Sequence, residues 1–326
     1  MKVAVIGLGS MGKRRIRLLL ERSDIEIIGI DSNIERCAEV SGRFHIKTYH
    51  SLKEALIDIE IQGAVISTSP LSHSTIIKDC LNSNLHVFTE INLVQDGYDE
   101  NIRLAEKKGL VLFLSSTFLY RQETQRIIKE VRNTKGSVNY IYHVGQYLPD
   151  WHPWESYSSY FIGDPRTNGC REIMAIELPW IVSAFGNIKR VKVLRGKISG
   201  LNIDYNDSYQ ILLEHDTGVR GTFNVDVVSR KATRHLEIYG ENLYMTWNGT
   251  PDSLYMYDTE KKEDIKIEFE NASEHISGYA AFVTENPYRE ELSVFLSQIK
   301  DRAFVAKWDF SRDLKVLNII DMIESK

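Results

Sequence analysis

Three glycines near the beginning of the chain have the spacing that a bound dinucleotide requires. Gly7, Gly9 and Gly12 form a Gly-x-Gly-x-x-Gly motif. Such glycines allow a tight turn, a close approach of backbone to a pyrophosphate and close packing of helix on strand. The following helix would offer free N–H groups and the positive end of its dipole to the phosphates. The remaining loop residues that we expect to line a dinucleotide are Leu8, Ser10 and Met11.

An acidic residue follows at the distance at which dinucleotide-binding domains place one. Asp31 comes about 20 residues after the loop, at the end of the next apolar run. Its carboxylate can accept hydrogen bonds from ribose hydroxyls, whereas its charge would repel a 2′-phosphate, so NAD is favoured over NADP. Ser32 is expected beside it, and Arg36 could stack on adenine or weaken the preference. The alternative is that Asp31 caps the next helix.

Polar residues also follow two further apolar runs, at 63–66 and 86–89. Ligands of doubly wound sheets bind beyond the carboxyl ends of the strands, so these residues are predicted to border the nicotinamide half of the cofactor. For His73 the alternative is a histidine with satisfied ring nitrogens at a helix start. The predicted residues are Ser67, Thr68, Ser69, Pro70, His73, Glu90, Ile91 and Asn92.

The elements that must position these groups alternate between strand and helix over residues 1–120. The apolar runs are nearly unbroken Val, Ile and Leu, which is typical of parallel strands buried on both faces. This half is therefore predicted to be a doubly wound parallel sheet in an α/β domain. Strands are expected at 2–7, 25–31, 46–49, 63–68, 86–90 and 110–116, with helices between them.

Residues 121–326 have a different periodicity of polar and apolar residues, which predicts an α+β domain with an open-faced, mostly antiparallel sheet. Polar and apolar residues alternate along 138–148, 188–198, 208–228 and 234–247, while helical patterns cover 122–133, 168–186, 287–301 and 311–325. A large sheet with helices on one side leaves its other face to be covered. We therefore expect a homodimer or a homotetramer.

The composition narrows the classes of partner. The 326 residues are 43% hydrophobic and 26% charged, with a formal net charge of −5. This mild acidity argues against nucleic acid or an anionic membrane as partner, which would favour a basic face. Three scattered cysteines indicate reduced thiols in a cytoplasmic protein. We expect no membrane span, and no metal, because no Cys/His cluster has ligand spacing.

Several of these motifs together resemble the glucose-fructose oxidoreductase, inositol dehydrogenase and MocA (Gfo/Idh/MocA) family. They are the glycine loop, Asp31, and residues 67–90, 168–186 and 286–301, so the likeness covers nearly the whole chain. The resemblance implies an NAD(P)-binding Rossmann domain followed by a domain that binds a sugar, polyol or nucleotide-sugar. Residues 145–157 further resemble a subgroup associated with bacterial surface-sugar biosynthesis.

The resemblance breaks where the family handles protons. The family carries a lysine in a Glu-Lys-Pro motif after strand five, and an Asp and a His one helical turn apart in its second domain. Here the lysine position holds Ile91, the Asp position Ile173, and the His position Glu177 or Ile176. The basic residue usual after strand six falls on Thr117. Isoleucine cannot take the hydroxyl proton released as hydride leaves a secondary alcohol.

Three residues are candidates to replace the missing catalytic groups. Glu177 would be a general base if burial raised its pKa, and a solvated carboxylate otherwise. Arg171 could bind a substrate carboxylate or phosphate, or form a surface salt bridge. His152 has a pKa suitable for proton transfer and lies in an aromatic loop. That loop is alternatively an aromatic contact between domains or subunits. The predicted substrate-binding residues are Trp151, Trp154, Glu172 and Tyr120.

The sequence thus predicts an NAD-dependent oxidoreductase acting on a sugar, sugar acid or nucleotide-sugar. In it, binding geometry and the redox cofactor supply most of the catalysis. Two alternatives stay open. One is an enzyme that retains NAD and uses a transient oxidation for elimination, epimerisation or glycoside cleavage. The other is a non-catalytic protein that binds a dinucleotide or a sugar.

Overall fold

The computed structural model describes residues 1–152, 155–269 and 284–325, and the chain divides into two compact units. The first unit comprises Met1–Thr117 and Tyr288–Leu314. Its six-stranded sheet has the order β3-β2-β1-β4-β5-β6, and all pairs are parallel. The strands are β1 (Lys2–Ile6), β2 (Glu26–Ile30), β3 (Lys47–Tyr49), β4 (Gly63–Ile66), β5 (His86–Thr89) and β6 (Leu112–Leu114). The helices are α1 (Ser10–Leu20), α2 (Ile34–Phe44), α3 (Leu52–Asp58), α4 (Pro70–Asn82), α5 (Tyr98–Lys108) and α8 (Asn286–Lys300).

The strands of the first unit are buried along nearly their whole length. All four residues of β4 and the last three of β5 are buried, as expected for strands covered on both faces. Two glycines begin or end helices where the backbone turns left-handed, Gly97 before α5 and Gly109 after it. The burial of these strands and their parallel pairing confirm the predicted doubly wound parallel sheet.

The segment Tyr288–Leu314 joins the first unit, although the sequence pattern suggested a single boundary near residue 120. Aromatic packing explains its place. The Phe295 ring of α8 packs edge-on against Phe88 of β5 and Phe113 of β6, with centroids 5.6 and 6.0 Å apart. Such aromatic pairs add to the stability that area burial provides, and α8 covers the sheet next to β6 as a result.

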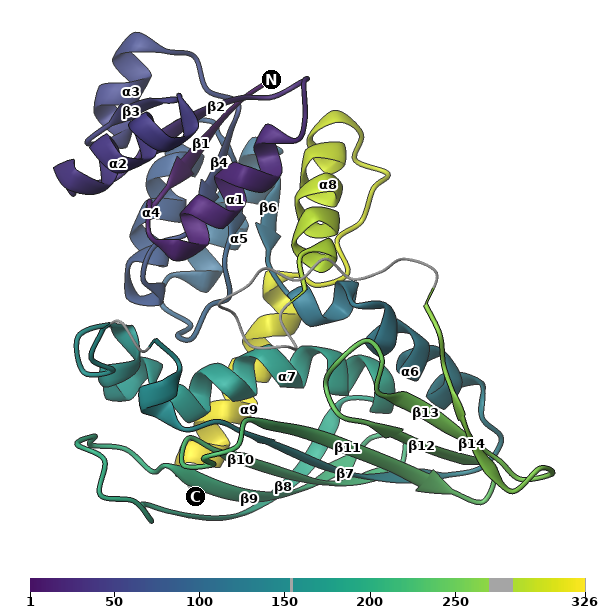
Figure 1. Ribbon diagram of the computed structural model, residues 1–326. Helices are drawn as coiled ribbons and strands as arrows, with labels where there is room; N and C mark the ends of the chain where they lie inside the picture. The colour runs from purple at the N-terminus through teal and green to yellow at the C-terminus, as the bar shows by residue number, and fades with distance from the viewer. Residues whose placement is uncertain (153–154, 270–283, 326) are drawn as a thin grey trace. The chain divides into compact units, whose positions relative to one another are not determined.

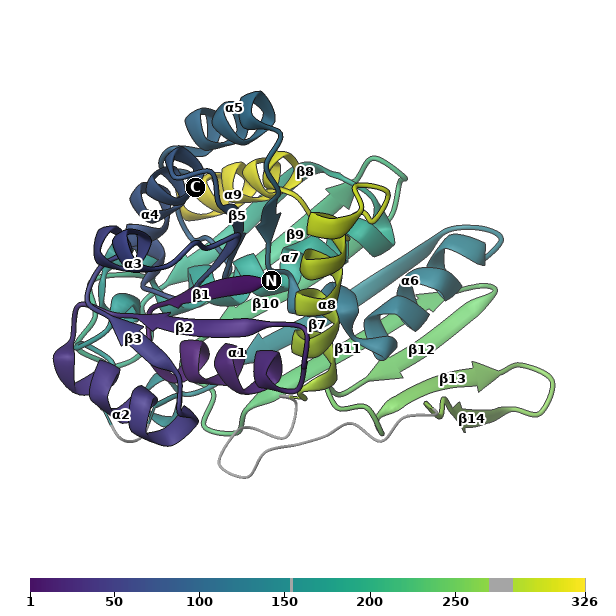
Figure 2. The ribbon, with the colours of Figure 1, turned by 90° about the horizontal axis from the view of Figure 1, so that it is seen from above.

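The second unit comprises Phe118–Pro287 and Lys315–Lys326. Its eight-stranded sheet has the order β14-β13-β12-β11-β7-β10-β9-β8, antiparallel except for the pair β7 and β10. Figure 2 shows these strands side by side from β8 to β14. They are β7 (Val138–Gly145), β8 (Ile188–Gly196), β9 (Ser208–His215), β10 (Arg220–Asp226), β11 (Thr233–Gly240), β12 (Leu243–Trp247), β13 (Leu254–Asp258) and β14 (Glu263–Lys266). No sequence pattern predicted β13 and β14.

Helices α6 (Gln122–Asn133) and α7 (Gly169–Phe185) lie along one face of this sheet (Figure 1). Helix α9 (Phe310–Ser325) begins in the first unit and ends in the second. The strands alternate between buried and exposed residues, as in β9, so only one sheet face is covered within this unit. The predicted open-faced, mostly antiparallel sheet is confirmed. Across the described residues, none of the helices has the length and apolarity of a membrane span.

Candidate functional site

The glycine loop has a backbone that only glycine tolerates at its turn. Gly7 has a φ of +93°, and its N–H donates to the Ile30 carbonyl at 2.8 Å. A methyl carbon at this residue would lie 2.7 Å from the Ser67 carbonyl oxygen. At Gly12 the same atom would lie 1.9 Å from the Gly7 carbonyl oxygen. The loop is therefore held tightly against β1, β2 and the end of β4.

Gly9 differs from its two neighbours because a methyl carbon there would meet nothing within 4 Å. It is the N-cap of α1, and no side chain caps that helix. The first N–H groups of a helix lack partners within it, so the N–H groups of Ser10, Met11 and Gly12 are available to a ligand. Open space above a helix N-terminus fits the pyrophosphate of a dinucleotide.

Asp31 lies beside this loop, nearly buried, at the end of β2. Its carboxylate accepts the backbone N–H of Leu8 and of Asn33, both at 2.8 Å. The Arg36 guanidinium lies 3.7 Å from it. The cap of α2 is Asn33, whose side chain accepts from the Arg36 N–H, so the alternative that made Asp31 the helix cap is wrong. Each carboxylate oxygen keeps a further lone pair for a ribose hydroxyl.

The polar groups at the end of β4 are mostly engaged with the protein. His73 is buried, with Nδ1 2.7 Å from Asn92 Oδ1 and Nε2 3.0 Å from the Thr68 carbonyl oxygen. Burial lowers its pKa. This is the satisfied histidine of the alternative interpretation. Ser69 is exposed and Pro70 opens α4, so Thr68, Ser69 and the half-buried Ser67 form the accessible rim there.

Glu90, at the end of β5, belongs to an ion-pair cluster that no sequence pattern predicted. The fully buried Arg15 donates to Glu90 Oε1 at 2.6 Å and Oε2 at 3.0 Å, and to Glu291 at 3.1 Å. Burial raises the pKa of Glu291 to about 7, although Arg15 opposes this. Arg15 shares a helix face with Gly12 and Leu19 at helical spacing, a signal that it would be buried. Arg15 thus connects α1 both to Glu90 at the end of β5 and to Glu291 of α8.

Ile91 is half-buried beside these groups, and its neighbour Asn92 is committed to His73. Thr117 donates to Glu291 at 3.2 Å. At the ends of β4, β5 and β6, the ionisable side chains named above are therefore bound to other protein groups. The contribution of these residues to cofactor binding stays a prediction.

In the second unit, Glu177 of α7 points into the core between this helix and the sheet. Its Oε1 accepts from Arg234 Nη2 at 2.7 Å and Nε at 2.9 Å, while its Oε2 accepts from Tyr142 and Trp180, both at 2.7 Å. The side chain is 0% exposed. These contacts argue against Glu177 as general base, because a closed core gives a substrate hydroxyl no approach to the carboxylate.

Arg171 and Glu172 begin α7 with opposite environments. Arg171 donates to Asp321, at 2.6 Å, and to Glu324 of α9. Its charge is thus matched inside the unit, which argues against a role as substrate anchor. Glu172 is half-buried, and burial raises its pKa to about 7. Of the predicted residues on α7, it alone keeps an uncommitted carboxyl group among the residues the structure describes.

The aromatic loop contributes His152 and Trp151 to the same region. His152 Nδ1 lies 2.8 Å from Glu155 and its ring stacks on Tyr160, with centroids 4.6 Å apart. Trp151 donates to the Gln146 carbonyl at 3.1 Å. Trp154 lies outside the described residues. Tyr120 is 2% exposed, which argues against its contact with a substrate.

Comparisons with known proteins agree with this geometry. The family described as "Oxidoreductase family, NAD-binding Rossmann fold" (GFO_IDH_MocA) matches residues 1–116. Biliverdin reductase A of Homo sapiens is 30% identical over 58% of this chain and 60% of its own length. The 4-carboxy-2-hydroxymuconate-6-semialdehyde dehydrogenase of Sphingobium is 27% identical over 40% of this chain and 43% of its own. The chain thus matches less than two thirds of each relative.

The fold is shared over a longer stretch. The UDP-N-acetylglucosamine 3-dehydrogenase GnnA of Acidithiobacillus ferrooxidans superposes with a TM-score of 0.78, at 16% identity, over 100% of this chain and 97% of that one. This likeness extends the common architecture to both units. Residues 1–116 are thus similar to the NAD-binding Rossmann domain of the Gfo/Idh/MocA oxidoreductases, and the fold of both units is similar to that of GnnA.

Proposed function

We propose that this chain is an NAD-dependent oxidoreductase acting on a hydroxyl of a sugar, a sugar acid or a nucleotide-sugar. The observation that carries the proposal is the open Gly9 position above the uncapped start of α1, next to the Asp31 carboxylate. NAD bound there would supply the acceptor for hydride. The carboxylate favours an unmodified ribose over a 2′-phosphate, which supports NAD as the preferred cofactor.

The sugar class is supported by the side chains around the start of α7. Aromatic rings and hydroxyl groups gather there, namely Trp151, Tyr157, Tyr160 and Tyr205. Sugars present an apolar ring face and polar hydroxyls that suit such side chains. The shared architecture with a nucleotide-sugar dehydrogenase is compatible with this class. The narrower role in surface-sugar biosynthesis rests on the resemblance of residues 145–157.

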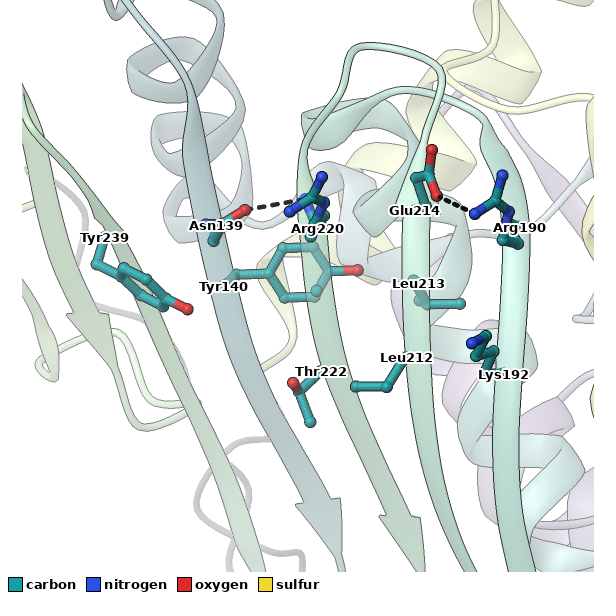
Figure 3. A pocket seen from close by; sticks show the side chains of 11 residues that line it. Asn139, Tyr140, Arg190, Lys192, Leu212, Leu213, Glu214, Arg220, Thr222 and Tyr239 are labelled. Carbon is teal, nitrogen blue, oxygen red and sulfur yellow. Dashed lines mark hydrogen bonds and ion pairs between the residues drawn. The ribbon is translucent and has the colours of Figure 1, made fainter.

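Self-association is part of the proposal because the bare face of the second sheet carries large apolar side chains. Leu212 is 56% exposed, Leu194 73% and Ile141 40%. Figure 3 shows Leu212 beside Lys192 and Thr222 on this face, with Arg190 paired to Glu214. A second copy covering this face would give the expected homodimer or homotetramer. A cytoplasmic location, supported by three free cysteines, is proposed with it.

The test is a cofactor and substrate screen on the purified chain. NAD and NADP are titrated by calorimetry, and NADH formation is followed by absorbance with UDP-N-acetylglucosamine, inositol and glucuronic acid. We expect tighter binding of NAD and net NADH formation with at least one of these substrates. Turnover that depends on bound NAD without net NADH would instead support transient oxidation. Failure to bind either dinucleotide would refute the proposal.

A further inference from the structure

The start of α7 gathers three polar side chains whose hydrogen-bonding capacity is unused. Within the part of the chain that the structure describes, the Tyr160 and Tyr205 hydroxyl oxygens are buried without a hydrogen-bond partner, and the Glu172 carboxyl makes no hydrogen bond. Folded proteins rarely leave buried polar groups in this state, and each exception needs a reason. A ligand rich in hydroxyls would be such a reason.

The three groups lie close enough to influence one another. Burial raises the pKa of Tyr160, and the Glu172 charge raises it further. The pKa of Tyr205 is raised mainly by burial and also by Glu172, while the nearby Gly169 N–H opposes this without reaching hydrogen-bond geometry. Burial also places the pKa of Glu172 itself near 7, the range that suits a general base at neutral pH.

The surroundings of the cluster are aromatic and contain more acidic than basic groups. His152 stacks on Tyr160 and lies 2.8 Å from Glu155, and Trp151 lies 3.5 Å from where a Gly169 side chain would begin. Arg171 at this end of α7 pairs with two carboxylates of α9, Asp321 and Glu324, and Asp207 and Asp226 act on the neighbouring Cys170, so these charged groups are mostly acidic. Glu172 is therefore left without a countercharge among the described residues.

We propose that Glu172 is the residue that takes the proton of the substrate hydroxyl, and that Tyr160 and Tyr205 bind neighbouring hydroxyls of the same sugar. The inference rests on the proposed oxidoreductase function. As the alcohol is oxidised, its O–H bond breaks and the proton goes to the Glu172 carboxylate. Its C–H bond breaks with the hydride passing to NAD⁺, and a C=O bond forms, so that NAD⁺ is reduced to NADH.

The kinetic test compares wild type with Glu172→Gln, using Glu130→Gln on α6 as the control. In the direction of alcohol oxidation, wild-type kcat/KM should rise with pH through about 7 as Glu172 ionises. Glu172→Gln should lose about 100-fold or more in kcat and this rising limb. The control pairs with Arg126 at 2.6 Å and should keep both. A Glu172→Gln enzyme with wild-type kcat and pH profile would overturn the assignment.

The melting temperature is a second readout, and it needs no turnover. It therefore tests the role of Glu172 independently of the proposed oxidoreductase activity. A carboxyl whose folded pKa is raised from 4.5 to about 7 stabilises the fold fully below pH 4.5. That contribution is lost as the pH rises through 7. Glu172→Gln should therefore melt above wild type at pH 8, by about 3 °C, and gain less at pH 5. An equal difference at both pH values would overturn the inference, even if no sugar substrate is found.

The tyrosines are tested by Tyr160→Phe and Tyr205→Phe. Because their hydroxyls make no hydrogen bond within the described structure, the variants should keep the wild-type melting temperature. Their KM for the sugar should rise about tenfold each, as expected when a hydrogen bond to substrate is lost. Tyr142→Phe is the contrasting variant, since it removes a bond to Glu177 and should melt lower. An unchanged KM in both tyrosine variants would overturn their role.

Discussion

Two places where ionisable side chains meet, one in each unit, show opposite arrangements. At the strand ends of the first unit, Arg15 binds Glu90 and Glu291, and His73 binds Asn92. At the start of α7 in the second unit, Glu172 makes no hydrogen bond to any described residue. A largely buried carboxyl without a partner is costly to ionise, and such groups are concentrated at functional sites. We therefore expect the groups at the start of α7 to transfer protons, and the groups at the strand ends to stabilise the fold.

Within the second unit the same contrast separates two glutamates of one helix. Glu177 is bound by Arg234, Tyr142 and Trp180 in the core, whereas Glu172, five residues earlier, is uncommitted. Removing one partner of a buried ion pair leaves the other charge exposed to a low-dielectric interior. The two residues should thus respond differently to the same substitution.

The largest effect is expected for Glu177→Gln, which leaves the Arg234 charge unbalanced in the core. The free energy of unfolding should fall by about 4 kcal/mol, measured by urea denaturation. Glu214→Gln is the control because it breaks an exposed pair with Arg190, which should cost less than about 1 kcal/mol. If Glu177→Gln kept full stability and lost only kcat, Glu177 would be the base and the comparison would be reversed.

The second largest effect is expected in the glycine loop, where Gly12 is tightly packed and Gly9 faces open space. Gly12→Ala places a methyl group against the Gly7 carbonyl and should lower the free energy of unfolding by about 2–3 kcal/mol. Gly9→Ala meets no protein atom and should change it by less than about 0.5 kcal/mol. It should still weaken NAD binding about tenfold or more by calorimetry. Unchanged NAD affinity in Gly9→Ala would mean that the open space holds no pyrophosphate.

The sequence predicts most of the fold because its periodicities are strong. Unbroken apolar runs such as 63–66 and alternating ones such as 208–215 gave the two sheet types directly. Residues 288–314 were harder to place, since a helical pattern shows that a face is buried but not against which sheet. The short strands β13 and β14 carry exposed residues and little alternation, so no pattern distinguished them from loops.

The parts of the site that can be predicted from the sequence are those whose contacts are local in the chain. The glycine loop and Asp31 are read from spacing because one strand-turn-helix unit contains nearly all of their geometry. Glu177 and Glu172 are both acidic residues of one helix, and their roles depend on Arg234, more than fifty residues away, and on Tyr160 and Tyr205 in loops. No local pattern records which distant side chain meets which carboxylate, so the sequence could not show that Glu177 is bound in the core while Glu172 is not.

A smaller effect is expected for the cofactor preference. Asp31→Asn removes the charge while keeping an oxygen for the Leu8 or Asn33 N–H. The ratio of NADP to NAD affinity should rise about tenfold, which corresponds to about 1.4 kcal/mol, measured by calorimetry with both dinucleotides. Glu35→Gln makes the same charge change on exposed α2 and should leave the ratio unchanged. An equal shift in both variants would mean that the net charge of the protein, and not the position of Asp31, sets the ratio of affinities.

The smallest effect tests whether the bare face of the second sheet is covered by another copy. Leu212 is 56% exposed, so burying its remaining surface at an interface would contribute about 1 kcal/mol. Leu212→Ala should therefore weaken self-association about fivefold in sedimentation equilibrium without changing the melting temperature of the dissociated chain. Ile57→Ala is the control, since Ile57 is 83% exposed and belongs to α3 of the first unit. If both variants associate as wild type does, this face is not the interface, and its apolar residues must be covered by a different partner or by none.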